Sequence, residues 1–256
     1  MQTLKFIGRG SAFNRAEGNN SAYIKKDNCF LLIDCGELVY DEIEKRSLIT
    51  EEIKEINIAI THLHGDHVGS LSSFIFWCYY KFNIIPNVIY RDVKAIEGYL
   101  TLQGTVKDVH YKLINGRKVN LENMNITLKA VEVEHCHVYK NMIDNVVIYE
   151  KPKEDSTLYK KVFRSYAYYI NADSKNIYFS GDSGEFNLGI DKMDELDEIY
   201  HDCSSYDIEG FPHIGLNTLA GKIKDEYRKK VYLMHFDSTD LILRGKELGF
   251  NIVEVE

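Results

Sequence analysis

The chain has 256 residues, 45% of them hydrophobic, and a formal net charge of −8. This is enough for one layered domain with a sizeable core, and the acidic balance disfavours a general nucleic-acid coat, because such binding rests on basic faces. The chain has no signal pattern at its N-terminus, no bilayer-length apolar run and no disulfide-type spacing of its five cysteines, so we expect a cytoplasmic protein.

The pattern of apolar residues predicts strands and helices along the whole chain. In chain order, we expect strands at 2–8, 20–24, 29–34, 56–60, 88–90, 109–114, 126–133, 166–170, 177–180, 196–200 and 231–234, and helices at 41–54, 71–82, 93–102 and 216–230. A less regular insert lies at about 138–164. Strands before and after helices, without a strict βαβ rhythm, predict two sheets sandwiched between helices.

A ligand-rich turn follows the strand at 56–60. Alternate residues of an extended backbone share a face, which brings His62 and His64 together. Gly65 permits a sharp turn, so that Asp66 and His67 point towards a second position. Imidazole and carboxylate groups suit zinc, and also iron or manganese, so the turn predicts ligands for two adjacent ions. The alternative, a polar loop with stray histidines, would need costly compensation if it were buried.

The remaining ligands are expected at other strand ends. The candidates are His135 or His137, Asp182 and His235. Asp182 stands between glycines, where its carboxylate could bridge two ions, and two such ions can activate water for phosphoryl displacement. The alternatives are a capping role for Asp182 and a core position for His235.

Two further histidines have weaker signals. His110 has no motif around it, and we interpret it as structural. His201 either supports a ligand through a hydrogen bond or is simply buried.

In these residues, the sequence resembles the ribonuclease Z-like branch of the metallo-β-lactamase superfamily. The residues from Thr61 to His67 match its HxHxDH motif. Further matches are Gly10-Ser11-Ala12, Leu32 to Glu37, Val133 to Cys136, Tyr178 to Ser183 and Leu233 to Phe236. The resemblance favours His135 over His137 as ligand. It implies an αββα sandwich of two mixed sheets flanked by helices, as a single domain over 1–256 with the small insert at about 138–164.

The resemblance also implies two zinc ions per subunit, with manganese as a possible substitute, and phosphodiester hydrolysis. One ion would be held by His62, His64 and His135, the other by Asp66, His67 and His235, with Asp182 bridging the two.

The resemblance also implies a catalytic group. His213 resembles the catalytic histidine of the branch, with Asp202 and Glu209 upstream, and would act as general acid oriented by Glu209. Asp66 would serve catalysis as well as metal binding. Separately from the resemblance, the small-residue loop at 8–11 is either a plain turn or a site whose amides stabilise charge on the phosphate oxygens.

The substrate is inferred from two departures from ribonuclease Z. The insert is short for the arm that grips transfer RNA, and the motif at His213-Ile214-Gly215 is altered. A small acidic chain without the arm looks like the phage anti-Pycsar phosphodiesterases, which hydrolyse cyclic nucleotides to disarm bacterial defence. This implies hydrolysis of small cyclic mononucleotides such as cCMP, cUMP, cAMP and cGMP by a homodimer in the host cytoplasm, with no membrane and no extended nucleic acid as partner.

The sequence leaves three alternatives to this function open. They are a ribonuclease Z-type tRNA 3′ endonuclease, a non-catalytic protein that sequesters nucleotides, and a thioester or lactone hydrolase.

Overall fold

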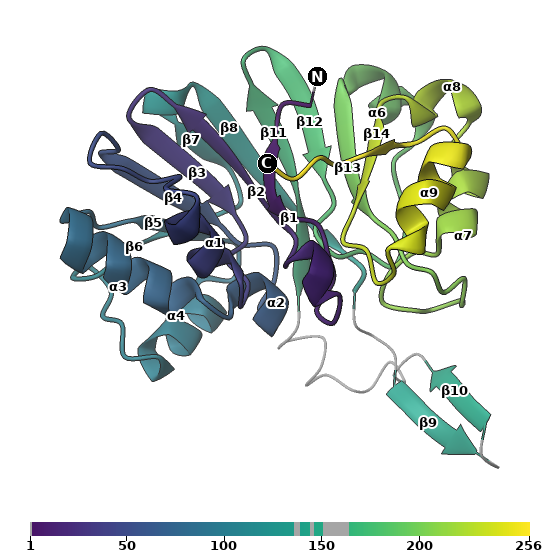
Figure 1. Cartoon of the computed structure of the whole chain (residues 1–256), viewed down its shortest axis with the longest axis horizontal. Helices are drawn as coiled ribbons and strands as arrows, with labels where there is room; N and C mark the ends of the chain where they lie inside the picture. The colour runs from purple at the N-terminus through teal and green to yellow at the C-terminus, as the bar shows by residue number, and fades with distance from the viewer. Residues whose placement is uncertain (1, 136–138, 144–145, 151–163) are drawn as a thin grey trace.

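The computed structural model describes residues 2–135, 139–143, 146–150 and 164–256, and it describes side chains outside 136–163. Within these residues, the strands form two large sheets and a separate two-stranded ribbon. The two large sheets lie face to face and helices cover their outer sides, as Figure 1 shows. Since both sheets are mixed, the αββα sandwich predicted from the sequence is confirmed.

The first sheet has six strands in the order β1-β2-β3-β4-β5-β6. They are β1 (Lys5–Gly8), β2 (Ser21–Lys26), β3 (Cys29–Ile33), β4 (Glu55–Ala59), β5 (Asn87–Tyr90) and β6 (Lys112–Asn115). β1 to β3 pair antiparallel and β3 to β6 pair parallel. The parallel strands β3 and β4 are almost wholly buried, as continuous apolar runs require. The outer side carries α1 (Val39–Lys45), α3 (Leu71–Phe82) and α4 (Val93–Leu102).

The second sheet has seven strands in the order β15-β14-β13-β12-β11-β8-β7. They are β7 (Val119–Leu121), β8 (Ile126–Val133), β11 (Ser165–Ala172), β12 (Lys175–Phe179), β13 (Glu198–Asp202), β14 (Val231–Met234) and β15 (Asn251–Ile252). β12 to β15 pair parallel, and the other pairs are antiparallel. Beside the parallel half lie α6 (Ile190–Glu195), α7 (Leu216–Lys222), α8 (Asp225–Arg228) and α9 (Asp240–Glu247) (Figure 1).

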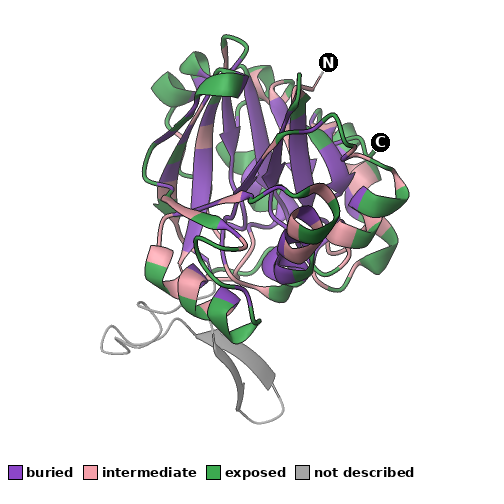
Figure 2. Cartoon of the chain, turned by 90° about the vertical axis from the view of Figure 1, so that its left-hand side faces the viewer, coloured by how far each residue is buried: buried purple, intermediate pink, exposed green. Residues whose placement is uncertain are grey.

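Aromatic side chains join the two sheets. The ring of Phe6 in β1 lies 6.5 Å from that of Phe179 in β12 and 5.5 Å from that of Tyr200 in β13, measured between centroids. The buried hydroxyl of Tyr168 donates to the carbonyl of Ile60 at 2.8 Å. Figure 2 shows the buried residues concentrated along the strands. Each large apolar side chain contributes about 1.5–3 kcal/mol when buried, so the sandwich provides a rigid frame for the loops at its edges.

The helix predicted at 41–54 is shorter than expected. α1 ends at Lys45, because the chain turns at Ser47, whose φ is 50°. The apolar residues Ile49 and Ile53 still reach the core, but they do so from a loop. Their spacing predicts a longer helix, but within this segment only the residues up to Lys45 are helical.

The helix predicted at 216–230 is also interrupted. It divides into α7 and α8 at Ile223, whose backbone is extended. The guanidinium of Arg228 donates to the carbonyls of Ala220 and Ile223, which satisfies acceptors at the end of α7.

Several short elements were not predicted. Within the insert, β9 (Tyr139–Ile143) and β10 (Val146–Glu150) form an antiparallel hairpin where the sequence suggests a less regular segment. The elements α6, α9, β7 and β15 were missed, and so were the one-turn helices α2 (Gly65–Val68), η1 (Arg15–Glu17) and η2 (Glu122–Met124). Among the described residues, none of the helices combines the length and apolar character that crossing a bilayer would take.

Candidate metal centre

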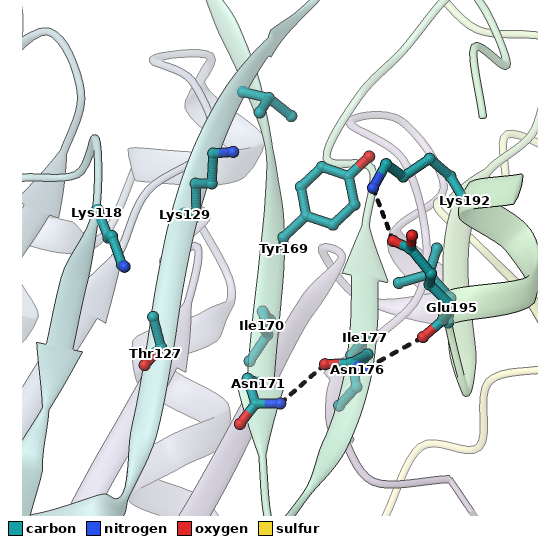
Figure 3. Close-up of a pocket in the computed structure, with 12 residues that line it drawn as sticks. Lys118, Thr127, Lys129, Tyr169, Ile170, Asn171, Asn176, Ile177, Lys192 and Glu195 are labelled. Carbon is teal, nitrogen blue, oxygen red and sulfur yellow. Dashed lines mark hydrogen bonds and ion pairs between the residues drawn. The ribbon is translucent and has the colours of Figure 1, made fainter. Parts of the chain in front are cut away.

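Two cavities of similar size differ in their chemistry. One, of about 570 Å³, is a groove on the outer side of the second sheet, between β8, β11 and α6. Lysine and amide side chains line it, and the Lys192 ammonium lies 2.7 Å from the Glu195 carboxylate (Figure 3). The other cavity, of about 450 Å³, lies at the strand ends and is lined by imidazole and carboxylate groups. Metal ions prefer these ligands, so the candidate site is the second cavity.

The ligand-rich turn directly follows β4. His64 has an extended backbone, and the short helix α2 begins after it. The His67 amide donates to the His64 carbonyl at 3.0 Å and so closes the turn. His62 and His64 therefore project from the extended segment, whereas Asp66 and His67 project from the helix. This matches the predicted division of the four side chains into two pairs.

Gly36 allows this turn to pack closely against the end of β3. A Cβ at residue 36 would lie 2.6 Å from the carbonyl carbon of Asp66 and 2.9 Å from the Cβ of Asn19. The neighbouring Cys35 amide donates to the His67 carbonyl at 2.7 Å. Backbone contacts therefore hold the turn in place, and they leave no room for a side chain at residue 36.

One group of potential ligands consists of three histidines and an aspartate. Their ligand atoms all lie within 4.8 Å of one another, and the residues are His62, His64, His135 and Asp182. The Nε2 atom of His62 lies 3.0 Å from Nδ1 of His64, and Nε2 of His135 lies 3.3 Å from the same atom. Burial lowers the pKa of His135 to about 3 and that of His62 well below its ordinary value. Neutral imidazoles are the form that binds metal.

A second group shares the same aspartate. It consists of Asp66, His67, Asp182 and His235, with their ligand atoms also within 4.8 Å of one another. The Nε2 atom of His235 lies 3.3 Å from Oδ2 of Asp66 and 3.4 Å from Oδ1 of Asp182. The other oxygen of Asp182 lies 3.3 Å from Nε2 of His67 and 3.6 Å from Nε2 of His62. The carboxylate of Asp182 therefore faces both groups, as a bridging ligand would.

The two groups fit divalent cations by charge and by hydrogen bonding. Among the described residues, Nε2 of His67 and Oδ1 of Asp182 are buried polar atoms without a hydrogen-bond partner. Burial opposes a charge on His67, but Asp182, Asp66 and Asp34 outweigh it and raise its pKa well above the ordinary value. A positive charge is therefore favoured where these atoms converge. Buried polar atoms without a hydrogen-bond partner are also costly unless a ligand binds them. A metal ion supplies both needs.

Asp34 orients one of the ligands from behind. Its carboxylate accepts hydrogen bonds from the amide and hydroxyl of Thr61, each at 2.8 Å, and lies 2.8 Å from Nδ1 of His67. This contact fixes the His67 ring with Nε2 facing the carboxylates of Asp66 and Asp182. Sequence reasoning did not assign Asp34 a role, although an acid directly after a buried strand was an available signal. In the same way, Nδ1 of His135 lies 3.0 Å from the carbonyl of Pro212.

His213 lies beside the metal ligands and is paired with a buried carboxylate. Its Nδ1 atom is 2.9 Å from Oδ2 of Asp202, and its ring stacks on that of His235 at 4.9 Å. Oδ2 of Asp202 also accepts a hydrogen bond from the Ser183 amide at 3.1 Å. Burial lowers the pKa of His213, but the hydrogen bond with Asp202 and the charge of Asp182 raise it more, so the net shift is upward. The ring can therefore carry a proton at Nε2.

The carboxylate that meets His213 is Asp202 rather than Glu209. Glu209 is exposed on the loop that precedes His213, and no contact joins the two among the described side chains. The sequence placed both acids upstream of His213, and only the fold distinguishes them, because Asp202 ends a strand whereas Glu209 lies in a loop.

The other predicted histidines have separate places. His201 is buried, and its Nδ1 lies 3.2 Å from Oδ1 of Asp202, so it supports the partner of His213. The His110 ring packs 5.0 Å from those of Phe76 and Tyr79 on α3, away from the metal centre, in keeping with a structural role. His137 lies outside the described residues.

The amides of the loop at 8–11 are not free to meet an anion. The amides of Arg9, Gly10 and Ser11 donate to the carbonyls of Glu17, Gly18 and Phe236. These three amides hold the shape of the loop, which agrees with the expectation of a plain turn and not with that of an anion site.

The fold and the two ligand groups define a metal-dependent hydrolase of the metallo-β-lactamase fold, which uses divalent metal. Two solved structures share this fold over most of their length. YhfI from Bacillus subtilis has a TM-score of 0.68 and 17% identity, covering 99% of this chain and 95% of that one. The short form of human tRNase Z has a TM-score of 0.64 and 17% identity, covering 98% and 96%.

Closer relatives identify the family. The family model described as Anti-Pycsar protein Apyc1 matches residues 2–254, so the chain belongs to this family. A protein of that name from Paenibacillus harenae is 26% identical over 261 residues, covering 98% of this chain and 96% of the relative. Another from Bacillus phage vB_BsuM-Goe3 is 26% identical over 247 residues, covering 91% and 88%.

Proposed function

We propose that this chain is a dinuclear zinc phosphodiesterase that hydrolyses cyclic mononucleotides to linear nucleotides. The observation that carries the proposal is the Asp182 carboxylate, which faces two complete ligand groups beside the His213–Asp202 pair. Membership of the anti-Pycsar family supports a cyclic nucleotide as substrate, since the family is named for opposing a cyclic-nucleotide defence.

Each ligand group would hold one ion. His62, His64 and His135 would bind the first, and Asp66, His67 and His235 the second, with Asp182 contributing to both. Bound zinc supplies Lewis acidity, which activates water near neutral pH and offsets charge on phosphate oxygens. Manganese is an acceptable substitute for this ligand set.

The chain itself supplies the proton for the leaving group. In hydrolysis, a new bond forms between water oxygen and phosphorus while the bond from phosphorus to the sugar oxygen breaks. His213 would protonate that sugar oxygen from Nε2, and the contact of its Nδ1 with Asp202 at 2.9 Å supports this role. Burial opposes the protonated ring, but Asp202 and Asp182 raise the pKa of His213 overall, which favours the protonated form.

The cavity suits a small substrate. Its volume of about 450 Å³ lies in the range of pockets for small molecules, and its walls combine the metal ligands with aromatic groups. The polar end would receive the cyclic phosphate and the apolar mouth would receive the base.

The test is a substrate panel with product identification. Zinc-loaded protein is incubated with cAMP, cGMP, cCMP and cUMP in ¹⁸O-labelled water, and the products are resolved by mass spectrometry. We expect linear monophosphates with one labelled oxygen. The variant His213→Ala should retain its metal and lose roughly 10²–10⁴-fold in turnover. His110→Ala is the matched control, and it should retain both.

The same panel separates the rival functions. Cleavage of a precursor tRNA, with cyclic nucleotides untouched, would favour a tRNA 3′ endonuclease. Recovery of intact nucleotide after denaturation would favour a sequestering protein, and hydrolysis of a thioester or lactone alone would favour another branch of the fold. Metal-loaded protein that leaves all four cyclic nucleotides intact contradicts the proposal.

The proposal includes a homodimer acting in the cytoplasm of a bacterial host. Its basis is the resemblance to the anti-Pycsar phosphodiesterases, in which a loop of one subunit helps to close the pocket of the other. Light scattering on the purified chain tests the dimer, and a monomeric mass at full activity would remove it.

A further inference from the structure

Phe13 is an apolar side chain that the protein leaves in solvent at the mouth of the catalytic cavity. Its exposed fraction is 96%, the highest among the large apolar side chains that the structure describes, and it lines the cavity together with Ser11 and Ala12. An exposed phenyl ring gives up the favourable free energy that burial would supply. A ligand that covers the ring would recover it.

The segment that carries Phe13 is held in place by backbone hydrogen bonds. The Asn14 amide donates to the Ser11 carbonyl at 3.1 Å, which closes a turn around Phe13. The Ser11 amide and the side-chain amide of Asn14 both donate to the Phe236 carbonyl, each at 3.0 Å. The Phe236 amide in turn donates to the Arg9 carbonyl at 2.8 Å. Both ends of the turn are therefore anchored to one residue.

That anchoring residue is adjacent to a metal ligand. Phe236 directly follows His235, so the hydrogen bonds fix the turn around Phe13 relative to the metal centre. With the backbone preorganised, only the side-chain torsions of Phe13 need to be ordered when a ligand binds, which lowers the entropic cost of the contact.

Other aromatic groups continue the apolar wall towards the catalytic histidine. The rings of Tyr206 and Phe211 lie 5.4 Å apart, and the Phe211 ring lies 6.1 Å from that of His213. Both line the same cavity as Phe13. The cavity thus has an apolar mouth and a metal-binding floor, which suits a ligand with a flat ring at one end and an anionic group at the other.

We infer that Phe13 is a substrate-binding residue that stacks on the base of the cyclic nucleotide. The inference rests on the proposed function. A phenyl ring has no hydrogen-bonding group, so it recognises the flat face of a base and not its edge pattern. Phe13 should therefore contribute to the binding of all four bases and contribute more to purines, whose larger faces cover more of the ring.

The experiment pairs a side-chain truncation with removal of the base. Wild-type protein, Phe13→Ala and Phe13→Tyr are assayed with cAMP, with cCMP and with 1-deoxyribose 3′,5′-cyclic phosphate, which lacks a base. For Phe13→Ala we expect KM to rise about tenfold with cAMP and less with cCMP, with kcat unchanged. With the baseless substrate, the variant and the wild type should have equal KM. Phe13→Tyr should restore the wild-type values, because its ring also stacks.

The control is Leu102→Ala, which removes another highly exposed apolar side chain, 89% exposed on α4, outside the cavity. It should behave as wild type with every substrate. Metal content and melting temperature are measured for all variants, so that misfolding is distinguished from weaker binding.

The outcomes separate this inference from the proposed function. If wild-type protein hydrolyses none of the cyclic nucleotides, the proposed function fails. If it hydrolyses them and Phe13→Ala has an unchanged KM, the stacking role fails alone. An equal rise in KM with the baseless substrate also overturns it, since the ring would then act on the sugar or on the shape of the pocket. A change of mass in light scattering that accounts for the KM change would assign Phe13 to a subunit contact instead.

Discussion

The substitution Gly36→Ala tests whether close backbone packing sets the position of the metal ligands. The added Cβ would lie 2.6 Å from the carbonyl carbon of Asp66, whereas ordinary contacts begin at about 3.4 Å. The carbonyl oxygen of Asp66 would lie closer still. The turn must therefore retreat by more than about 0.8 Å, because the contacting atoms of Asp66 belong to the backbone. Metal–ligand distances tolerate deviations of only about 0.2 Å. We expect the variant to lose metal affinity at the site that includes Asp66 and His67, and to lose about 1–3 kcal/mol of metal-free stability from overpacking.

The assay for Gly36→Ala is metal content by elemental analysis after reconstitution and dialysis, combined with denaturant unfolding of the metal-free chain. Gly98→Ala is the matched control, because a Cβ at residue 98 meets nothing within 4 Å. Residue 98 lies inside α4, where replacing glycine by alanine should stabilise the fold by about 0.5–1 kcal/mol. A Gly36→Ala protein that binds two ions per chain with wild-type affinity and stability would refute the packing argument.

Three further predictions follow from other contacts. Asp34→Asn should weaken metal binding about 10–100-fold in chelator competition, because the His67 ring loses its carboxylate partner; unchanged affinity would contradict this role. Burial alone would raise the pKa of Glu198, but hydrogen bonds from Lys175 and Tyr200 outweigh it and lower the pKa. Stability from this ion is thus present above its ordinary pKa of 4.5 and lost as pH falls through the lower folded value, so wild type should lose more stability than Glu198→Gln, by at most about 2 kcal/mol, in urea titrations between about pH 6 and pH 3. Stripping the metal should lower the melting temperature, since ions at about a thousand times their Kd stabilise the folded chain by about 4 kcal/mol; equal melting of the loaded and stripped protein would count against the site.

The ligand turn was predictable because its signal is local. Four ligand-type residues within six positions after a buried strand are hard to explain otherwise, and the alternation of an extended backbone separates His62 and His64 from Asp66 and His67. Asp182 and His235 were predicted from strand ends. In the structure, β12 and β14 are parallel strands of the same sheet and bring these two side chains within 3.4 Å of each other.

The features that escaped prediction depend on contacts distant in sequence. The choice of Asp202 over Glu209 depends on which acid ends β13, and the pattern of charges does not encode that. The engagement of the amides at 9–11 depends partly on Phe236, which is far away along the chain. The break at Ile223 is favoured by Arg228, whose hydrogen bonds to helix-end carbonyls no apolar periodicity reveals.

The candidate metal ligands come from both halves of the chain, so metal binding depends on how the two halves assemble. Asp66 and His235 are 169 residues apart in sequence, and they lie in segments that follow strands of different sheets. Neither sheet alone presents a complete ligand group, since each group draws on the turn after β4 and on strand ends of the second sheet. On the proposed ligand assignment, the two sheets must come together before ions bind, so we expect metal uptake to be a late event in maturation. Bound metal would then cross-link the halves at one edge, so we expect the metal content of a preparation to report how much of it has reached the native state.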